Sequence, residues 1–202
     1  MGIKERRARQ KEHLRAEILE AAREMFFKEG VEKVSMRAIA KKIEYSPTTI
    51  YLYFKDKSEL FRSLCEEAFA KLEYELEEIK KTEDDPVECL RQGTVAYVNF
   101  GLAHPNHYRV VFMTTHPHGS DQTYKFSGSA GERSFLYMVS QIQRAMEQGK
   151  FRPGDPVQAA QTAWSTMHGL TSLMITQPGF PWAERNTLIQ HLADTLTRGL
   201  QE

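Results

Sequence analysis

The fold is decided by the stretch Ser35–Phe61, which reads SMRAIAKKIEYSPTTIYLYFKDKSELF. Its pattern predicts a helix, a tight turn, a short second helix and the start of a third helix. Ser35 is a residue type that caps helix N-termini, and it stands just before the apolar face of the first helix. Ser46 caps the second helix in the same way, and Pro47 fits its first position because no amide hydrogen is needed there. The second helix is therefore predicted to be short and sharply angled to the first.

The outward residues of the second helix carry hydroxyl groups and no carboxylate. They are Thr48, Thr49, Tyr51 and Tyr53, and Lys55 and Lys57 stand beside them. Hydroxyl donors next to ammonium groups suit a groove lined by phosphates. In a helix-turn-helix, the second helix enters the major groove while its neighbours hold the DNA backbone. An ordinary helical hairpin would need neither this run of donors nor a basic arm, so DNA binding is the favoured interpretation.

Charge is unevenly divided along a chain whose formal net charge is zero. Residues 1–62 hold 15 Lys and Arg against 10 Asp and Glu, whereas residues 63–202 hold 12 against 17. A basic front end joined to an acidic remainder indicates a polyanion-binding module attached to something else. We expect residues 2–15, with six Lys and Arg and two Glu, to form an arm that grips phosphate or the minor groove. A frayed, solvated helix start would have the same composition.

In order and spacing, the deciding stretch resembles the DNA-binding domain of the tetracycline-repressor-like (TetR) family of bacterial transcription regulators. The matching residues are Ser35, Ile39-Ala40, Ser46, Thr49-Ile50-Tyr51, Tyr53-Phe54 and Lys57-Ser58-Glu59-Leu60. Two positions depart from the family pattern, because Glu44 and Thr48 stand where glycine is usual or common. We expect Glu44 to take a strained turn conformation at a cost of about 1 kcal/mol. Thr48 adds a side chain that faces DNA.

The resemblance covers the first third of the chain closely and the remainder only by helical layout. It implies a sequence-specific, DNA-binding transcription regulator in the cytoplasm, a repressor that binds a pseudo-palindromic duplex operator. A small hydrophobic ligand would enter the second domain, shift the long connector helices and misplace the two recognition helices. We expect DNA contacts from Ser35, Arg37, Ser46, Thr48, Thr49, Tyr51, Tyr53 and Lys57. Among these, Ser35, Tyr53 and Lys57 are expected at phosphates.

Helical periodicity continues through the rest of the chain, so the predicted fold is all-α. A first helix is expected from about Gln10 to Glu29, ended by Gly30, and a long one from Asp56 to about Lys81. Further helices are expected after Pro86, after Pro105, around Phe135–Met146, after Pro156 and at the C-terminus. The segment Thr115–Glu132 is rich in Gly, Ser and His and is predicted to be a loop. We divide the chain into a DNA-binding domain, residues 1–55, and a ligand-binding and dimerisation domain, residues 56–202.

The last two helices carry the predicted dimer interface. Residues 157–174 are apolar nearly all round, which is typical of a helix buried on two sides. The last helix carries leucines at a period of four, namely Leu188, Leu192, Leu196 and Leu200. Paired across a two-fold axis, such helices would form the four-helix interface through which this family usually dimerises. A self-contained monomeric core is the alternative.

The second domain holds more Met, Phe, Tyr and Trp than a minimal helical core requires. Flexible thioethers and flat rings suit a cavity that adapts to an apolar guest. The candidate ligand-binding residues are Tyr97, Phe100, Phe112, Met113, Phe135, Met138, Trp164, Met167 and His168. Trp164 to Gly169 also resembles the W-x-x-x-H-G motif of one TetR subgroup. The same residues could instead simply fill the core.

Other chemistry has weaker support. Cys65 and Cys89 lack a metal-ligand spacing and are expected to be reduced core residues, with a redox pair as the alternative. His104, His107, His116 and His118 lie close in sequence, but without a neighbouring Cys or acidic ligand they predict no metal site. Ser165 and His168 have no oxyanion-forming loop, so no catalytic residue and no cofactor are predicted. No apolar run reaches the roughly 20 residues that span a bilayer. The rival from another class is a helical enzyme or small-molecule carrier with an incidental helix-turn-helix, whose DNA affinity would not fall steeply with salt.

Overall fold

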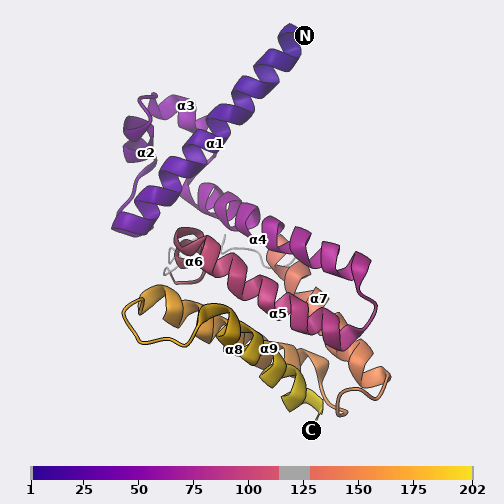
Figure 1. Cartoon of the computed structure of the whole chain (residues 1–202). Coiled ribbons are helices and arrows are strands. Elements are labelled where there is room, and N and C mark those ends of the chain that lie inside the picture. The colour runs from indigo at the N-terminus through magenta and orange to yellow at the C-terminus, as the bar shows by residue number, and fades with distance from the viewer. Residues whose placement is uncertain (1, 114–127, 202) are drawn as a thin grey trace. The chain divides into compact units, whose positions relative to one another are not determined.

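The computed structural model describes residues 2–113 and 128–201, and the regular structure in those residues is entirely helical (Figure 1). The helices are α1 (Ile3–Glu29), α2 (Met36–Lys42), α3 (Pro47–Tyr51), α4 (Lys57–Thr82), α5 (Pro86–Ala103), α6 (Pro105–Phe112), α7 (Ala130–Glu147), α8 (Pro156–Thr176) and α9 (Arg185–Gln201). The predicted all-α fold is confirmed.

The chain forms two compact units. The first holds residues 1–67 and 106–125, of which the structure describes 2–67 and 106–113. The second holds residues 68–105 and 126–202. Helix α4 is continuous through residue 67, so it contributes to both units. The functional division at residue 55 stays a prediction.

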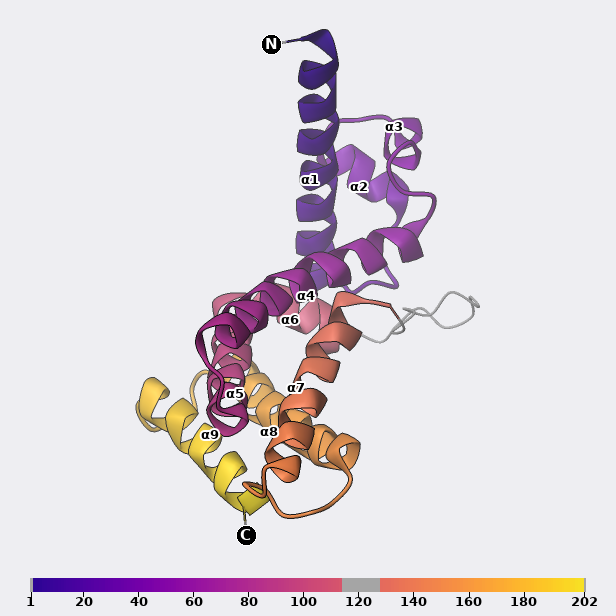
Figure 2. The ribbon, with the colours of Figure 1, turned by 90° about the vertical axis from the view of Figure 1, so that its right-hand side faces the viewer.

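In the first unit, α1 packs against α2, and α2 packs against α3. Phe26 of α1 also contacts Phe61 of α4, with ring centroids 6.2 Å apart. The largest fully buried side chains there are Ile18, Phe26, Ile39, Ile50, Phe54, Leu60 and Leu64. Helix α1 begins at Ile3 rather than near Gln10, so the prediction of its start was wrong. Residues 3–29 contain neither Gly nor Pro and are rich in Glu, Arg, Ala and Lys, all strong helix formers. In both views the first turns of α1 extend beyond α2 and α3 (Figures 1 and 2).

The turn between α2 and α3 passes through Glu44, which has a φ of 60°. This left-handed conformation is the one expected for the position where the TetR pattern usually has glycine. A side chain there brings Cβ close to the following carbonyl oxygen, whereas glycine adopts the conformation freely. The strain predicted for this turn is therefore present.

Replacing Glu44 by glycine is expected to raise the free energy of unfolding by about 1 kcal/mol, or Tm by about 2–4 °C for a chain of this size. Glu44 is exposed, so the change removes no core packing. The control is Glu44→Ala, which removes the same carboxylate but keeps Cβ. If both variants stabilise the protein equally in thermal unfolding, the effect comes from the charge and the backbone argument is wrong.

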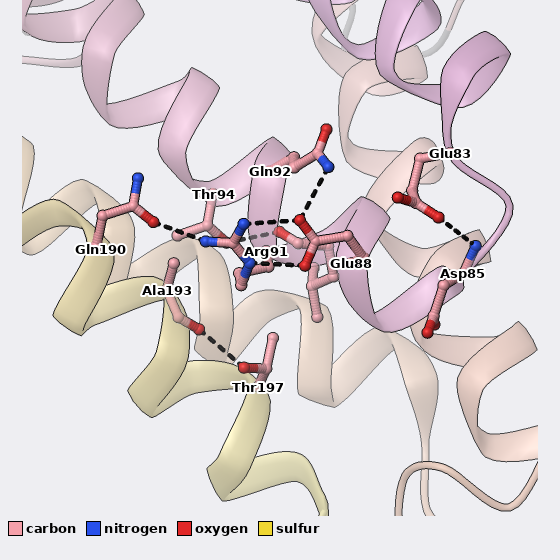
Figure 3. Close-up of polar contacts among 10 residues, drawn as sticks. Glu83, Asp85, Glu88, Arg91, Gln92, Thr94, Gln190, Ala193 and Thr197 are labelled. Carbon is pink, nitrogen blue, oxygen red and sulfur yellow. Dashed lines mark hydrogen bonds and ion pairs between the residues drawn. The ribbon is translucent and has the colours of Figure 1, made fainter.

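In the second unit, α5 packs against α7, α8 and α9, and α7 also packs against α8 (Figure 2). Helix α9 turns Ile189, Ala193 and Thr197 into this core. A polar contact reinforces the pair α5–α9, because Arg91 Nη1 donates to Gln190 Oε1 at 2.6 Å (Figure 3). Arg91 is itself held by the carboxylate of Glu88, three residues earlier on α5, at 2.7 Å.

The structure defines the inward faces of the last two helices. The buried residues of α8 are Ala160, Ala163, Met167, Thr171 and Ile175. Trp164 and Leu173 lie outside this buried face, and 40% and 50% of their surfaces are exposed in the single subunit. The four leucines of α9 are half-buried, beside the fully buried stripe of Ile189, Ala193 and Thr197. Helical periodicity locates an apolar stripe on each helix. The small and β-branched residues at the edge of that stripe then decide which of its sides packs into the core.

Most of the predicted loop Thr115–Glu132 lies outside the described residues. Its last three residues, Ala130–Glu132, instead form the first turn of α7. Ser129 caps that turn, accepting the backbone N–H of Glu132 at 3.0 Å. Because the whole segment is rich in Gly, Ser and His, its composition did not single out Ser129 as a helix cap.

Candidate functional site

The helix-turn-helix is held in shape by two serine caps. Ser35 Oγ accepts the backbone N–H of Ala38 at 3.1 Å, and Ser46 Oγ accepts that of Thr49 at 3.2 Å. Ser46 Oγ also lies 2.8 Å from the hydroxyl of Thr49. Both predicted caps are confirmed, and each satisfies one of the unpaired donors that begin a helix.

The eight residues predicted to contact DNA are placed by α2, α3 and the segment that follows. Five of them are exposed: Ser35, Arg37, Ser46, Thr48 and Tyr51. Thr49, Tyr53 and Lys57 are half-buried. Leu52, which directly follows α3, also has 75% of its surface exposed. Its exposure follows from the buried positions on either side, Ile50 and Phe54.

Lys57 has a structural partner as well as a predicted functional one. Its ammonium group donates to the carbonyl oxygens of Val31, at 2.8 Å, and Glu32, at 3.2 Å. These bonds tie the start of α4 to the segment after α1. An ammonium group has three donors, so two carbonyl contacts leave one for a phosphate.

The N-terminus of α4 is closed by a variant of the capping box. Asp56 Oδ1 accepts the backbone N–H of Glu59 at 2.8 Å. The return contact from Glu59 goes to the backbone N–H of Lys55 at 2.5 Å, one residue before the cap. The side chains of this segment are therefore fixed by local bonds.

A cavity of about 80 Å³ lies within the second unit, between side chains of α4, α5, α7 and α8. Its lining is Phe69, Leu72 and Leu76 from α4; Leu90, Gly93, Thr94 and Tyr97 from α5; Gly131, Ser134, Phe135, Tyr137 and Met138 from α7; and Trp164 and Met167 from α8. None of these lining residues carries a charge. An apolar cavity of this kind can hold a small apolar guest.

Five of the nine predicted ligand-binding residues line this cavity, namely Tyr97, Phe135, Met138, Trp164 and Met167. The other four do not. Phe100 is buried elsewhere on α5 and packs against His104, with ring centroids 5.5 Å apart. Phe112 and Met113 belong to the first unit. His168 lies beside Trp164, with ring centroids 6.3 Å apart, but is not part of the lining.

The contribution of α4 and Tyr137 to the lining was not foreseen from the sequence. Leu72 and Leu76 have the ordinary spacing of a helix stripe, so nothing in the sequence separates a cavity wall from a filled core. Small residues were a possible signal: a Cβ added to Gly93 would lie 3.3 Å from Leu76 Cδ2 and 3.7 Å from Tyr137 Cε1.

Most polar side chains of the cavity lining are hydrogen-bonded to other groups of the protein. Trp164 Nε1 donates to the hydroxyl of Tyr97 at 3.2 Å. The hydroxyls of Thr94 and Ser134 each donate to the backbone carbonyl four residues earlier, at 2.9 Å. The hydroxyl of Tyr137 is buried beside the thiol of Cys89.

Burial governs the ionisable groups of the second unit. It raises the pKa of Tyr137, with a smaller contribution from the nearby Cys89 thiol. It also raises the pKa of Cys89 and lowers that of His168, so that both side chains are held in their neutral forms. In the first unit, burial raises the pKa of Cys65 to about 12. Both cysteines are free and buried, and a raised thiol pKa disfavours the reactive thiolate.

Comparison with known families agrees with this architecture. Residues 18–64 match the family described as "Bacterial regulatory proteins, tetR family", and residues 90–196 match "Tetracyclin repressor-like, C-terminal domain". The second match alone spans more than half of the chain. The chain belongs to the TetR family. Its members are DNA-binding regulators rather than enzymes.

This TetR-family chain is similar to one curated relative in sequence and to two solved structures in fold. The HTH-type transcriptional regulator AcrR of Shigella flexneri is 38% identical over 79 residues, which cover 39% of this chain and 37% of AcrR. A SmeT–triclosan complex has a TM-score of 0.75 and 21% identity, covering 93% of this chain and 91% of SmeT. AibR in complex with isovaleryl coenzyme A and operator DNA has a TM-score of 0.68 and 20% identity, covering 93% and 97%. At these identities the two structures show a shared fold.

Two further properties of this TetR-family chain follow from the described residues. No helix among them is long and apolar enough to cross a membrane. No group of three metal-ligating side chains is found in the same part of the chain. Of the four histidines weighed as metal ligands, His116 and His118 lie outside it.

Proposed function

We propose that this TetR-family regulator is a repressor, released from a pseudo-palindromic operator by a small hydrophobic ligand. The observation that carries the proposal is the uncharged cavity of the second unit. One of its walls belongs to α4, the helix whose first residues hold the helix-turn-helix unit. Three residues of this wall, Phe69, Leu72 and Leu76, follow Lys57 on one continuous helix. A guest that displaces this wall would also move the start of α4.

The proposed DNA-contacting surface rests on the exposed side chains of α2 and α3. The side chains assigned to the bases are Arg37, Thr48, Thr49 and Tyr51. Those assigned to the DNA backbone are Ser35, Ser46, Tyr53 and Lys57. The N-terminal part of α1 adds basic side chains on an exposed helix. These are Lys4, Arg6, Arg7, Arg9, Lys11 and Arg15. A rigid basic helix, rather than a flexible arm, is thus the proposed phosphate grip.

Replacing Lys57 by alanine is expected to weaken binding to all DNA sequences, because phosphate contacts carry no sequence information. The slope of log affinity against log salt should become shallower by about one unit per subunit. Thr48→Ala should leave that slope unchanged and instead alter discrimination at one or two base positions. Fluorescence anisotropy with operator and random duplexes, at several salt concentrations, measures both effects.

Lys71→Ala is the matched control, because it removes the same charge from an exposed position of α4 in the second unit. Thermal unfolding must accompany the Lys57 titration, since this variant also loses the bonds to Val31 and Glu32. Unchanged salt slopes in both lysine variants would remove Lys57 from the phosphate contacts.

The ligand class is inferred from the cavity lining. A cavity without charged side chains disfavours a guest with a buried charge. Proteins of the same fold have been solved with triclosan and with isovaleryl coenzyme A, the latter together with operator DNA. Trp164 should report binding directly, because it lines the cavity and Trp182 can be replaced to leave a single fluorophore.

Dimerisation is proposed through α8 and α9. The exposed side of α8 carries small hydroxyl residues that donate to its own backbone: Thr162, Ser165, Thr166, Ser172 and Thr176. With their hydrogens already bound, these residues can be covered by a partner without leaving donors unpaired. Short side chains also let two helices approach closely. The half-buried leucines of α9 supply apolar surface.

A further inference from the structure

The cavity of the second unit is small for a complete effector. Its volume of about 80 Å³ lies well below the roughly 300–1,000 Å³ of pockets that enclose a small-molecule ligand. A guest confined to this cavity could bury only a short apolar group. An effector of ordinary size must therefore extend beyond the cavity.

A groove of about 300 Å³ adjoins the cavity between α4 and α7. Leu76 of α4 and Ser134 and Tyr137 of α7 line both the groove and the cavity, so these side chains stand between the two. Together the two volumes reach the lower end of the range for ligand pockets. A shift of Leu76, which belongs to the α4 wall of the cavity, would join them.

The groove differs from the cavity because charged side chains line it. It holds two carboxylates and two cations, from Glu73, Glu77, Lys80 and Arg133. Arg133 of α7 donates to both carboxylate oxygens of Glu73 on α4, with Nη2 at 2.9 Å from Oε2, so these two charges neutralise each other. Glu77 and Lys80 are exposed and stand three residues apart on α4, where side chains are neighbours on the helix surface. The groove therefore offers an acceptor beside a donor, with no net charge.

We propose that the effector is an uncharged amphipathic molecule whose apolar part occupies the cavity and whose hydrogen-bonding head, of the amide class, lies in this groove. Lys80 donates to the oxygen of the head, and Glu77 accepts its N–H. A full charge on the head would be attracted by one of these two groups and repelled by the other, and it would lie beside the uncharged lining of the cavity. This inference rests on the proposed ligand-binding function of the cavity and makes it more specific.

Four probes with the same phenylpropyl skeleton separate the possible head groups. Hydrocinnamamide carries the amide, propylbenzene has no head, hydrocinnamate carries a carboxylate and phenylpropylammonium carries a cation. Isothermal titration calorimetry on the full chain should give hydrocinnamamide about tenfold higher affinity than propylbenzene, the effect of one net hydrogen bond. The carboxylate and the cation should each bind at least tenfold more weakly than the amide.

Replacing Glu77 by leucine and Lys80 by methionine together should lower the affinity for hydrocinnamamide about tenfold and leave that for propylbenzene unchanged or slightly higher. The difference between the two effects is the coupling between the head and the groove. The matched control is Glu75→Leu with Lys71→Met, which makes the same changes at exposed positions of α4 outside both linings. This control should keep the preference for the amide. Thermal unfolding must show that both double variants fold.

Gly93→Leu tells failure of the groove from failure of the cavity. A leucine there projects toward Leu76 and Tyr137 and should abolish binding of both neutral probes. If hydrocinnamamide and propylbenzene bind the original chain equally and the Glu77 and Lys80 changes affect neither, the groove holds no head group while the cavity stands. Binding of hydrocinnamate or phenylpropylammonium as tight as that of the amide would overturn the assignment of an uncharged head. If neither neutral probe binds, or Gly93→Leu leaves their binding intact, both this proposal and the cavity are wrong.

Discussion

Replacing Leu192 and Leu196 together by aspartate is expected to convert the proposed dimer into monomers and to lower operator affinity at least 100-fold. Each change appears in both subunits, so four carboxylates would enter the paired interface. Burying an unpaired carboxylate costs several kcal/mol, more than most dimer interfaces can offset. Operator binding falls because the two half-sites are no longer bound by linked recognition helices, which removes a gain of about 10²–10⁴ in affinity. Sedimentation velocity gives the oligomeric state, and anisotropy gives the affinity.

The control variant adds the same number of carboxylates to the same helix, α9. His191 and Gln201 are both exposed on α9, so His191→Asp with Gln201→Asp should remain dimeric and bind DNA. Circular dichroism must show that the leucine variant is still helical, since these leucines are half-buried within the subunit as well. A folded leucine variant that still sediments as a dimer would move the interface away from α9.

Gly93→Leu is expected to give a regulator that binds its operator normally and no longer responds to its effector. The added side chain occupies the cavity, while the replacement of glycine by leucine within α5 favours the helix by about 0.8–1 kcal/mol. The ligand concentration needed for half-release from DNA should rise at least 100-fold, which corresponds to a loss of roughly 2.8 kcal/mol of binding free energy. Acetophenone and a panel of uncharged lipophilic compounds are suitable ligands.

Two quantities are measured: the release of the protein from DNA and the occupancy of the cavity by the ligand. Release from operator is followed by anisotropy, and occupancy by Trp164 fluorescence in a Trp182→Phe background. Gly199→Leu is the matched control, since Gly199 is an exposed helical glycine with no atom within 4 Å of an added Cβ. A Gly93→Leu protein that still releases DNA at the original ligand concentration would place the effector outside this cavity. Trp164→Ala should blunt release more weakly, because it opens the cavity wall without filling it.

The sequence alone predicted the parts of this protein that depend on local chemistry. Ser35 and Ser46 could be recognised as caps because a capping hydroxyl needs only the backbone three residues away. The strain at Glu44 followed from a pattern that usually has glycine in a tight turn, and the φ of 60° agrees. The end of α1 before Gly30 and the starts of α5 at Pro86 and α8 at Pro156 could also be predicted from the sequence. Glycine and proline have this effect because each determines the conformation of its own backbone.

Tertiary structure alone decided which apolar residues face a cavity and which fill a core. Tyr97, Phe135 and Trp164 line the cavity, whereas Phe100, which was predicted together with them, is buried elsewhere on α5. Periodicity could not separate them, because the two kinds of burial have the same helical period. The place of Gly93 in the cavity wall could not be read from its neighbours in sequence, since it depends on which side chains of α4, α5 and α7 meet in space. Caps and turns are short-range and are encoded within a few residues, whereas an empty space is defined by what several distant helices leave unfilled.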